Sequence, residues 1–359
     1  MKIGIIKELD DHRVALVPST IKKNANLKVE YLMEKGAGAT AGFPDHTFSD
    51  LVTISDRNNV LSSCDLLITV KPLPDADLKV LRENTVYISL FEPYNDSQID
   101  DRLKENKLTG FSMDMIPRTT LAQSMDILSS MASIAGYKAV VKAADHLDRY
   151  FPMMMTAAGT IKPAKVLVLG AGVAGLQAIA TARKLGAMVE AFDVRKASKE
   201  EVESLGAKFV EVEGAKDDSA AGGYAVEQSE DFLRRQKQEV QDRAIKADVI
   251  ITTAQLRGRK APVLVEEETV SKMQPGSVIV DLAASTGGNC AVTRNGEVFT
   301  HPSGVIIIGD SSLPSDMPKD ASTLFSNNVM NFLKLLVDEN GNLVIDMDNE
   351  IVSNALVTK

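Results

Sequence analysis

The stretch KVLVLGAGVAGLQAIATARKLGAMVEAFD, residues 165–193, decides the fold of this chain. A run of strand composition leads directly into glycines 170, 172 and 175. A helical pattern then continues to Leu185, and a second apolar run ends at Asp193. Strand, glycine-rich turn, helix, strand and terminal acid in this order match the G-x-G-x-x-G motif of a dinucleotide-binding βαβ unit. The stretch therefore predicts a Rossmann domain.

Each glycine of the motif has a physical role. Gly170 would permit the tight turn, Gly172 would let the main chain approach a pyrophosphate, and Gly175 would let helix and strand pack closely. The helix amino end would offer N–H groups to the phosphates. Asp193 favours NAD(H) over NADP(H), because it would accept from the ribose 2′-OH and repel a 2′-phosphate; Arg195 could serve a 2′-phosphate and weakens that preference. The predicted nucleotide-binding residues here are Gly170, Gly172, Val173, Ala174, Gly175, Asp193, Val194 and Arg195.

Alternating strand and helix patterns extend on both sides of the motif. The apolar runs KIGII, LLITV and TVYISL predict strands before residue 115, with helices over 19–35 and 98–106. A longer helix is predicted over 120–141, with Leu121 on its apolar stripe. Six apolar runs between residues 165 and 310 match the strand number of a full dinucleotide-binding domain.

These patterns predict an α/β fold with two doubly wound parallel-sheet domains, the second a Rossmann NAD-binding domain. The helical pattern over 320–337 follows the six-strand unit, so we expect it to pack back onto the first domain. The expected division is a discontinuous first domain, residues 1–137 with 311–359, and a Rossmann domain, residues 138–310.

Composition excludes several classes of protein. The 359 residues are 44% hydrophobic and 25% charged with a net charge of −9, which suits a soluble two-domain protein and not a nucleic-acid binder. No apolar run reaches 18 residues, and the amino terminus turns charged after six residues, so we expect a cytosolic chain without a signal peptide. Cys64 and Cys290 are expected to be buried free thiols. The four histidines form no close pair, so no metal site is expected.

Two polar segments carry the remaining candidates. Residues 213–243 are polar, contain AGGYA and end in a charged helical run, which fits either a functional lid or an exposed insertion. In PRTTLAQSMD, residues 117–126, Arg118 could pair with Asp126 and Gln123 could bind a carboxamide or ribose, or all three could lie on a hydrated helix face. No catalytic acid or base stands out elsewhere, although an alcohol or amine dehydrogenase needs one.

The motifs RTTLAQSMDILSSMASIAGYKAVVKAA, MMTAAGTIKPAKVLVLGAGVAGLQAIATARKLGA, AGGYA and MQPGSVIVDLAASTGGNC closely resemble the NAD(H)-binding alpha subunit of proton-translocating NAD(P)+ transhydrogenase, a relative of alanine dehydrogenase. The resemblance implies a homodimer of two-domain chains with NAD(H) in the cleft between domains. It implies direct hydride transfer between NAD(H) on this chain and NADP(H) on a partner subunit, without proton transfer at this site. It also implies membrane-spanning partner subunits that couple the reaction to proton movement, with this chain cytoplasmic and peripheral to the plasma membrane.

The resemblance also assigns residues. It implies that Arg118, Gln123 and Asp126 form the loop beside the nicotinamide, with Ser129 next to them. It further implies a mobile loop whose tyrosine closes over the nucleotide. Two departures stand out: Gln255 in TAQLRG replaces an expected leucine, and Ser285 with Thr286 replaces an acidic stretch. The additional nucleotide-binding residues implied are Ser129, Gly223, Tyr224, Gln236 and Gln255.

Two alternatives stay open. Arg13 and Lys71 match the pair that holds the substrate carboxylate in alanine dehydrogenases, which favours an NAD-dependent amino acid dehydrogenase. The histidine expected of that enzyme is absent from YISLFEPYN, which argues against it. The third hypothesis is a non-catalytic NAD-binding regulator.

Overall fold

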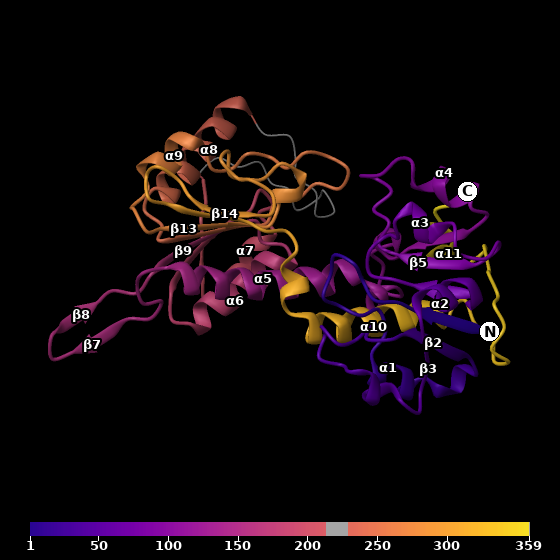
Figure 1. Ribbon diagram of the computed structural model, residues 1–359. Helices are drawn as coiled ribbons and strands as arrows, with labels where there is room; N and C mark the ends of the chain where they lie inside the picture. Colours follow the sequence, from indigo (N-terminus) through magenta and orange to yellow (C-terminus); the bar gives the residue numbers. More distant parts are fainter. Residues whose placement is uncertain (213–228, 359) are drawn as a thin grey trace. The chain divides into compact units, whose positions relative to one another are not determined.

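The chain folds into two compact units, each built around a parallel β-sheet (Figure 1). The computed structural model describes residues 1–212 and 229–358. Unit 1 comprises Met1–Met131 and Pro314–Lys359, and unit 2 comprises Ala132–Leu313. The predicted α/β fold with two parallel-sheet domains is confirmed.

The sheet of unit 1 has six strands in the order β3-β2-β1-β4-β5-β6, and every neighbouring pair is parallel. This is the doubly wound order, whose switch point lies between β1 and β4. The strands are β1 (Lys2–Ile5), β2 (Glu30–Glu34), β3 (Thr53–Ser55), β4 (Leu66–Ile68), β5 (Val86–Ser89) and β6 (Thr109–Ser112).

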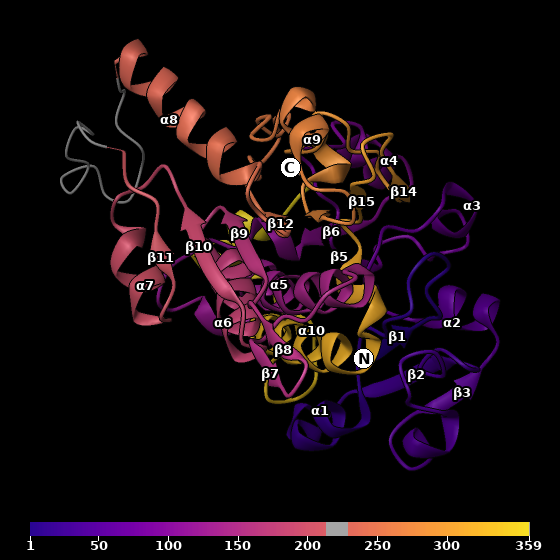
Figure 2. The same cartoon turned by 90° about the vertical axis from the view of Figure 1, so that its left-hand side faces the viewer.

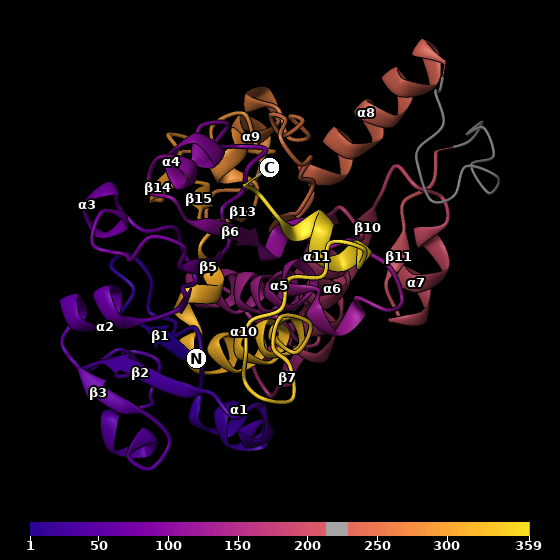
Figure 3. The same ribbon diagram turned by 90° about the vertical axis from the view of Figure 1, so that its right-hand side faces the viewer.

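Helices cover both faces of this sheet. Alternate residues of its strands therefore belong to different buried hydrophobic clusters, one on each face. Leu66 and Ile68 join one buried cluster and Leu67 joins the other. Helix α10 packs onto the first cluster through Phe325 and Phe332, as predicted for the late helix. The helices are α1 (Pro18–Lys23), α2 (Arg57–Ser63), α3 (Asp75–Leu78), α4 (Ile99–Glu105), α10 (Pro318–Leu333) and α11 (Glu350–Ala355), which lies near β6 (Figure 3).

The helix predicted over 19–35 is wrong. Only α1 is helical there; a short 3-10 turn, η1 (Ala25–Leu27), follows it, and Lys28 adopts a left-handed conformation with φ of 52°. The next residues form β2, whose Tyr31 and Met33 are buried. The apolar spacing of this segment fits both a helix and a strand, and the sheet position decides between them.

The sheet of unit 2 has seven strands in the order β11-β10-β9-β12-β13-β15-β14 (Figure 2). All six predicted runs form parallel strands, and β14, which pairs antiparallel with β15 at the edge, was not predicted. The strands are β9 (Lys165–Leu169), β10 (Met188–Phe192), β11 (Lys208–Phe209), β12 (Val249–Thr252), β13 (Val278–Asp281), β14 (Glu297–Thr300) and β15 (Ile306–Gly309); the helices are α6 (Val173–Lys184), α7 (Ser198–Ser204), α8 (Glu230–Ala244) and α9 (Glu267–Lys272).

A long helix and a β-hairpin lie outside the two large sheets. Helix α5 (Ile127–His146) begins in unit 1 and continues into unit 2. Strands β7 (Met154–Thr156) and β8 (Gly159–Ile161) form a separate hairpin that projects from unit 2 (Figure 1). Within the described ranges, no helix has the length and apolar character that crossing a membrane requires.

Candidate functional site

The glycine motif lies at the carboxyl end of β9, an interior strand of the unit 2 sheet between β10 and β12. Gly170 has φ of +102°, a backbone conformation that residues other than glycine rarely adopt. A Cβ at this position would lie 2.4 Å from Thr253 Oγ1. Thr253 donates its hydroxyl to the Gly170 carbonyl at 3.1 Å. The turn is therefore fixed from the end of the neighbouring strand, β12.

The other two glycines differ from each other in their surroundings. A Cβ on Gly175 would lie 1.8 Å from the Gly170 carbonyl oxygen, so helix α6 packs against the turn at a distance only glycine permits. A Cβ on Gly172 would meet no heavy atom of the described residues within 4 Å. The open space at Gly172 is where a ligand could reach the main chain.

The amino end of α6 is suited to an anion. Gly172 is the N-cap, and no described side chain caps this end. The helix has no acidic residue in its first turn and ends with Arg183 and Lys184. Its first N–H groups and positive dipole end thus fit a pyrophosphate, and Val173 and Ala174 occupy the first turn.

Asp193 lies at the end of β10 and is tied to the glycine loop. Its carboxylate accepts the Ala171 N–H at 2.7 Å. It also accepts the Arg195 N–H at 2.8 Å and both Nε and Nη2 of the Arg195 guanidinium at 3.0 and 3.1 Å. Arg195 therefore forms an ion pair with Asp193. The residue predicted to repel a 2′-phosphate and the residue predicted to bind one thus contact each other. Val194 between them is exposed.

A buried network holds the loop after β12, which carries Gln255. Asn289 accepts the Ala254 N–H at 3.0 Å and donates to the carbonyls of Ala254 and Pro262 at 2.8 Å each. Asp281 in turn accepts the Asn289 N–H at 2.8 Å. Gln255 itself is exposed and donates to the Leu282 carbonyl at 2.7 Å. Gln255, at the position where a leucine was expected, thus forms a hydrogen bond with the segment that follows β13.

The candidates of the polar interval lie partly on α8. Gln236 is half-buried on this helix, which confirms the charged helical run predicted for its end. Gly223 and Tyr224 lie outside the described residues.

The segment PRTTLAQSMD in unit 1 is a loop of short turns, so the helix predicted over 120–141 is wrong at its start. Successive N–H groups bond three residues back, as from Gln123 to Thr120, and only η4 (Gln123–Met125) is helical before α5. Leu121, predicted on the apolar stripe, is 85% exposed. Ala122 and Met125 anchor the loop in the core instead.

Asp126 caps α5 instead of pairing with Arg118. Its carboxylate accepts the Ser129 N–H at 2.9 Å and the Ser129 hydroxyl at 2.6 Å, the arrangement of a helix N-cap. Arg118 and Gln123 are exposed. The described residues show no ion pair between Arg118 and Asp126, so that suggested pair is corrected: Asp126 fixes the end of the loop through Ser129.

Arg13 and Lys71 lie together at the switch point of the unit 1 sheet, around Asp11. Arg13 donates from Nε and Nη2 to the two Asp11 oxygens at 2.8 and 2.6 Å, and Lys71 Nζ lies 3.9 Å from Asp11 Oδ2. Burial alone would raise the pKa of Asp11, but the hydrogen bonds and charge of Arg13 hold it below its usual value. The two cations therefore already face one carboxylate of their own chain.

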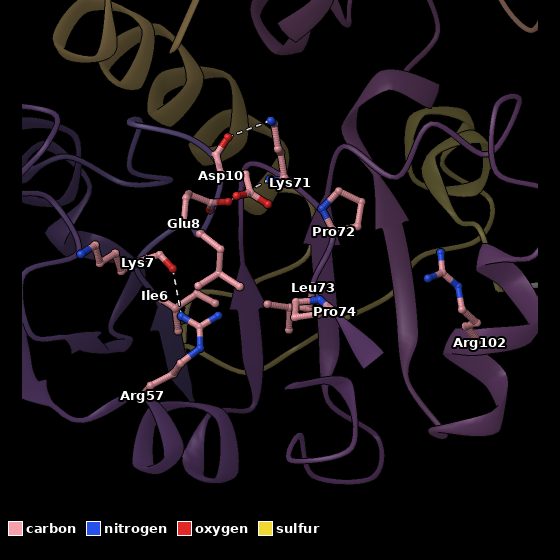
Figure 4. A pocket seen from close by; sticks show the side chains of 11 residues that line it. Ile6, Lys7, Glu8, Asp10, Arg57, Lys71, Pro72, Leu73, Pro74 and Arg102 are labelled. Atoms are coloured by element: carbon pink, nitrogen blue, oxygen red, sulfur yellow. Dashed lines mark hydrogen bonds between the residues drawn. The ribbon is translucent and has the colours of Figure 1, made fainter. Parts of the chain in front are cut away.

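Glu8 is the most perturbed carboxyl of this region. It is buried between the ends of β1 and β4, where it accepts the N–H groups of Val70 at 2.7 Å and Lys71 at 3.1 Å. Burial raises the pKa of Glu8 to about 7 despite these hydrogen bonds. Glu8 and Lys71 line a cavity of about 290 Å³, which also has Arg57 and Arg102 on its walls (Figure 4).

The sequence alone did not single out several of these residues. Thr253 directly follows β12, and Glu8 and Asp11 lie in the loop after β1. Ligands bind at the carboxyl ends of strands in open α/β sheets, and that position is the signal that could have found these three. Asn289 lies eight residues past the end of β13, so this signal does not reach it. Two asparagines of α10, Asn328 and Asn331, were not predicted either. They contact the PRTTLAQSMD loop, and nothing in their spacing predicts it.

Comparison with known proteins agrees with this geometry. Residues 4–135 match the model of the alanine dehydrogenase/PNT N-terminal domain, and residues 139–359 match that of its C-terminal domain. An NAD(P) transhydrogenase alpha subunit of Rhodospirillum rubrum is 44% identical over all of this chain and 96% of its own length. A transhydrogenase structure from Sinorhizobium meliloti is 39% identical, with a TM-score of 0.91 over 100% of this chain and 98% of its own.

An L-alanine dehydrogenase structure, at 24% identity, shares the fold with a TM-score of 0.80 over 99% of this chain and 94% of its own. The family inferred from the motifs is thus confirmed. The chain belongs to the alanine dehydrogenase/PNT family, and within it to the NAD(P) transhydrogenase alpha subunits.

Proposed function

We propose that this chain is the NAD(H)-binding subunit of a proton-translocating transhydrogenase. NADH bound here would pass a hydride to NADP+ on a partner subunit, giving NAD+ and NADPH. The observation that carries the proposal is the glycine loop of unit 2, where Gly172 is open, α6 is uncapped within the described chain, and Asp193 is tied to Ala171. These features suit a dinucleotide whose ribose keeps a free 2′-OH.

Each candidate residue has a role in this proposal. The motif from Gly170 to Gly175 would hold the pyrophosphate, and Asp193 with Arg195 would bind the adenosine ribose. In the other loop, Gln123 would orient the nicotinamide, Arg118 would line the site, and Asp126 would keep the loop in place by capping α5. The further nucleotide contacts proposed are Ser129, Val194, Gly223, Tyr224, Gln236 and Gln255.

Direct transfer needs no acid or base in this chain, because the hydride carries both electrons and the departing nucleotide is simply NAD+. The chain's own work would be to hold NADH and keep its nicotinamide face presented to the partner. The test is to mix the full chain with an NADP(H)-binding transhydrogenase subunit and follow NADPH formation from NADH. NADH binding without any transfer would favour the regulator.

The second candidate is an amino acid dehydrogenase, favoured by the placement of Arg13 and Lys71 around one carboxylate. The carboxylate that they contact in this chain belongs to Asp11 and not to a substrate, and it already accepts hydrogen bonds from two guanidinium nitrogens of Arg13. Alanine-dependent reduction of NAD+ by the chain alone would establish this alternative.

We further propose a homodimer formed through the β7–β8 hairpin, with membrane-spanning partner subunits to which the cytoplasmic dimer binds peripherally. Residues 151–161 carry no charge, although the chain has a net charge of −9, so like copies can meet there without repulsion. Met155 is 72% exposed and Ile161 44% exposed, and an isolated two-stranded sheet is marginally stable by itself. Sedimentation should show a dimer that Met155→Lys dissociates and Val298→Lys, on the exposed edge strand β14, leaves intact. A monomeric wild-type chain would refute the proposed dimer.

A further inference from the structure

Two asparagines of α10 hold the main chain of the PRTTLAQSMD loop. Asn328 Nδ2 donates to the Ser124 carbonyl at 2.9 Å, and Asn331 Nδ2 donates to the same oxygen at 3.2 Å. The two residues are three apart on one helix, so they lie on the same face and can reach one acceptor. Ser124 directly follows Gln123, whose own side chain is exposed.

Main-chain hydrogen bonds of the turn also hold the loop near Gln123, because the Gln123 N–H donates to the Thr120 carbonyl at 3.4 Å and the Gln123 carbonyl accepts the Asp126 N–H at 3.3 Å. Ala122 and Met125 anchor the loop by apolar packing, and Asp126 fixes its end by capping α5. The Ser124 carbonyl belongs to the peptide plane between Ser124 and Met125, and the Met125 N–H of that plane donates to the Ala122 carbonyl at 2.8 Å. The paired amides are the side-chain contacts that hold this plane, because turning the Ser124 carbonyl away would break both hydrogen bonds.

Asn328 also carries an unusual polar atom. The residue is 6% exposed, and its Oδ1 is buried with no hydrogen-bond partner among the described residues. An unsatisfied buried acceptor lowers stability, so a residue that keeps one needs another reason to be polar. The donor half of the same amide, directed at Ser124, supplies that reason.

We infer that Asn328 and Asn331 are positioning residues, which act through the Ser124 carbonyl to set the orientation of Gln123 for hydride transfer. The inference rests on the proposed function, in which Gln123 contacts the nicotinamide. It assigns α10 a role in the reaction in addition to covering the core of unit 1.

The structure provides a variant that separates positioning from stability. Asn328→Leu keeps the number and branching of the side-chain heavy atoms, removes the unsatisfied oxygen and removes the donor to Ser124. We expect an unchanged or raised melting temperature and unchanged NADH affinity. The rate of hydride transfer to partner-bound NADP+ should fall at least about fivefold, as expected for a lost hydrogen bond. A residue with only a structural role would lower the melting temperature together with the rate.

A matched control lies on the same helix. Asn327 accepts the Thr20 hydroxyl at 3.0 Å and belongs to a different face of α10. Asn327→Ala should leave the transfer rate unchanged, whereas Asn331→Ala should lower it less than Asn328→Leu, since its bond to Ser124 is longer.

A double-mutant cycle with Gln123→Ala completes the test. If Asn328 acts through Gln123, then Asn328→Leu should have little further effect on the transfer rate of Gln123→Ala. An Asn328→Leu rate equal to wild type, or an equal fold-loss in both backgrounds, would overturn the inference while leaving the role of Gln123 intact. A wild-type rate for Gln123→Ala would instead overturn the proposed role of Gln123, and the inference with it.

Discussion

Substitution by alanine should have different effects at Gly172 and Gly175: at Gly175 it should lower stability, and at Gly172 it should lower NADH affinity. In Gly175→Ala, the new Cβ would lie 1.8 Å from the Gly170 carbonyl oxygen, while real Cβ contacts stay above about 3.0 Å. Helix α6 and the turn must separate by more than 1 Å, and such overpacking costs about 3 kcal/mol of the free energy of unfolding. In Gly172→Ala the Cβ meets no described heavy atom, and the φ of −78° suits alanine.

The cost of Gly172→Ala to the free energy of unfolding should stay below about 1 kcal/mol, since alanine is only a poorer N-cap than glycine. The same Cβ would occupy the space that a pyrophosphate needs, so NADH affinity should fall at least tenfold, about 1.4 kcal/mol. Urea unfolding and NADH titration measure the two quantities separately. Normal NADH affinity in a folded Gly172→Ala variant would refute the assignment of the glycine loop to the dinucleotide.

Three further predictions use other contacts. Burial raises the pKa of Glu8 to about 7, so the folded chain keeps a proton that the unfolded chain releases above about pH 4.5. The free energy of unfolding of wild type relative to Glu8→Gln should therefore decline by up to about 3 kcal/mol between about pH 4.5 and pH 7, and a flat difference in urea titrations would contradict this. Asp193→Asn should weaken NADH binding and lower the NADH-to-NADPH affinity ratio at least about tenfold in titrations; an unchanged ratio would exclude Asp193 as the ribose contact. Gly136→Ala, whose Cβ would lie 2.1 Å from the Ala174 oxygen, should lower the melting temperature although alanine favours helices, and a higher one would show that α5 and α6 can separate there.

The sequence predicts unit 2 far better than unit 1. Each unit 2 run has a strand length, and the G-x-G-x-x-G motif fixes where the first strand ends. The antiparallel edge strand β14 was missed because its residues Glu297–Thr300 are mostly exposed and have no continuous apolar run. In unit 1, the β2 segment has a pattern that fits both the helical and the strand period, and only pairing with β1 and β3 resolves the choice.

The sequence predicts the part of the candidate site that the main chain of one local segment forms. It does not predict the part in which side chains from distant segments come together. Gly170 to Gly175 and Asp193 follow from local order, because their roles depend on the strand and helix that flank them. The start of α5 at Ile127 depends on Asp126 acting as a cap, which an aspartate within a helical pattern does not reveal. The contact of Asn328 with Ser124 joins residues 204 positions apart, and only the fold brings them together.

The most direct test of the proposed function follows the hydrogen itself. NADH carrying deuterium at both C4 positions would be incubated with the full chain and an NADP(H)-binding partner subunit loaded with NADP+, and the mass of the NADPH formed would be measured by mass spectrometry. Direct transfer predicts one deuterium in each NADPH and none released to water. Unlabelled NADPH, or no NADPH in the presence of a partner that is active with another alpha subunit, would contradict the proposed function.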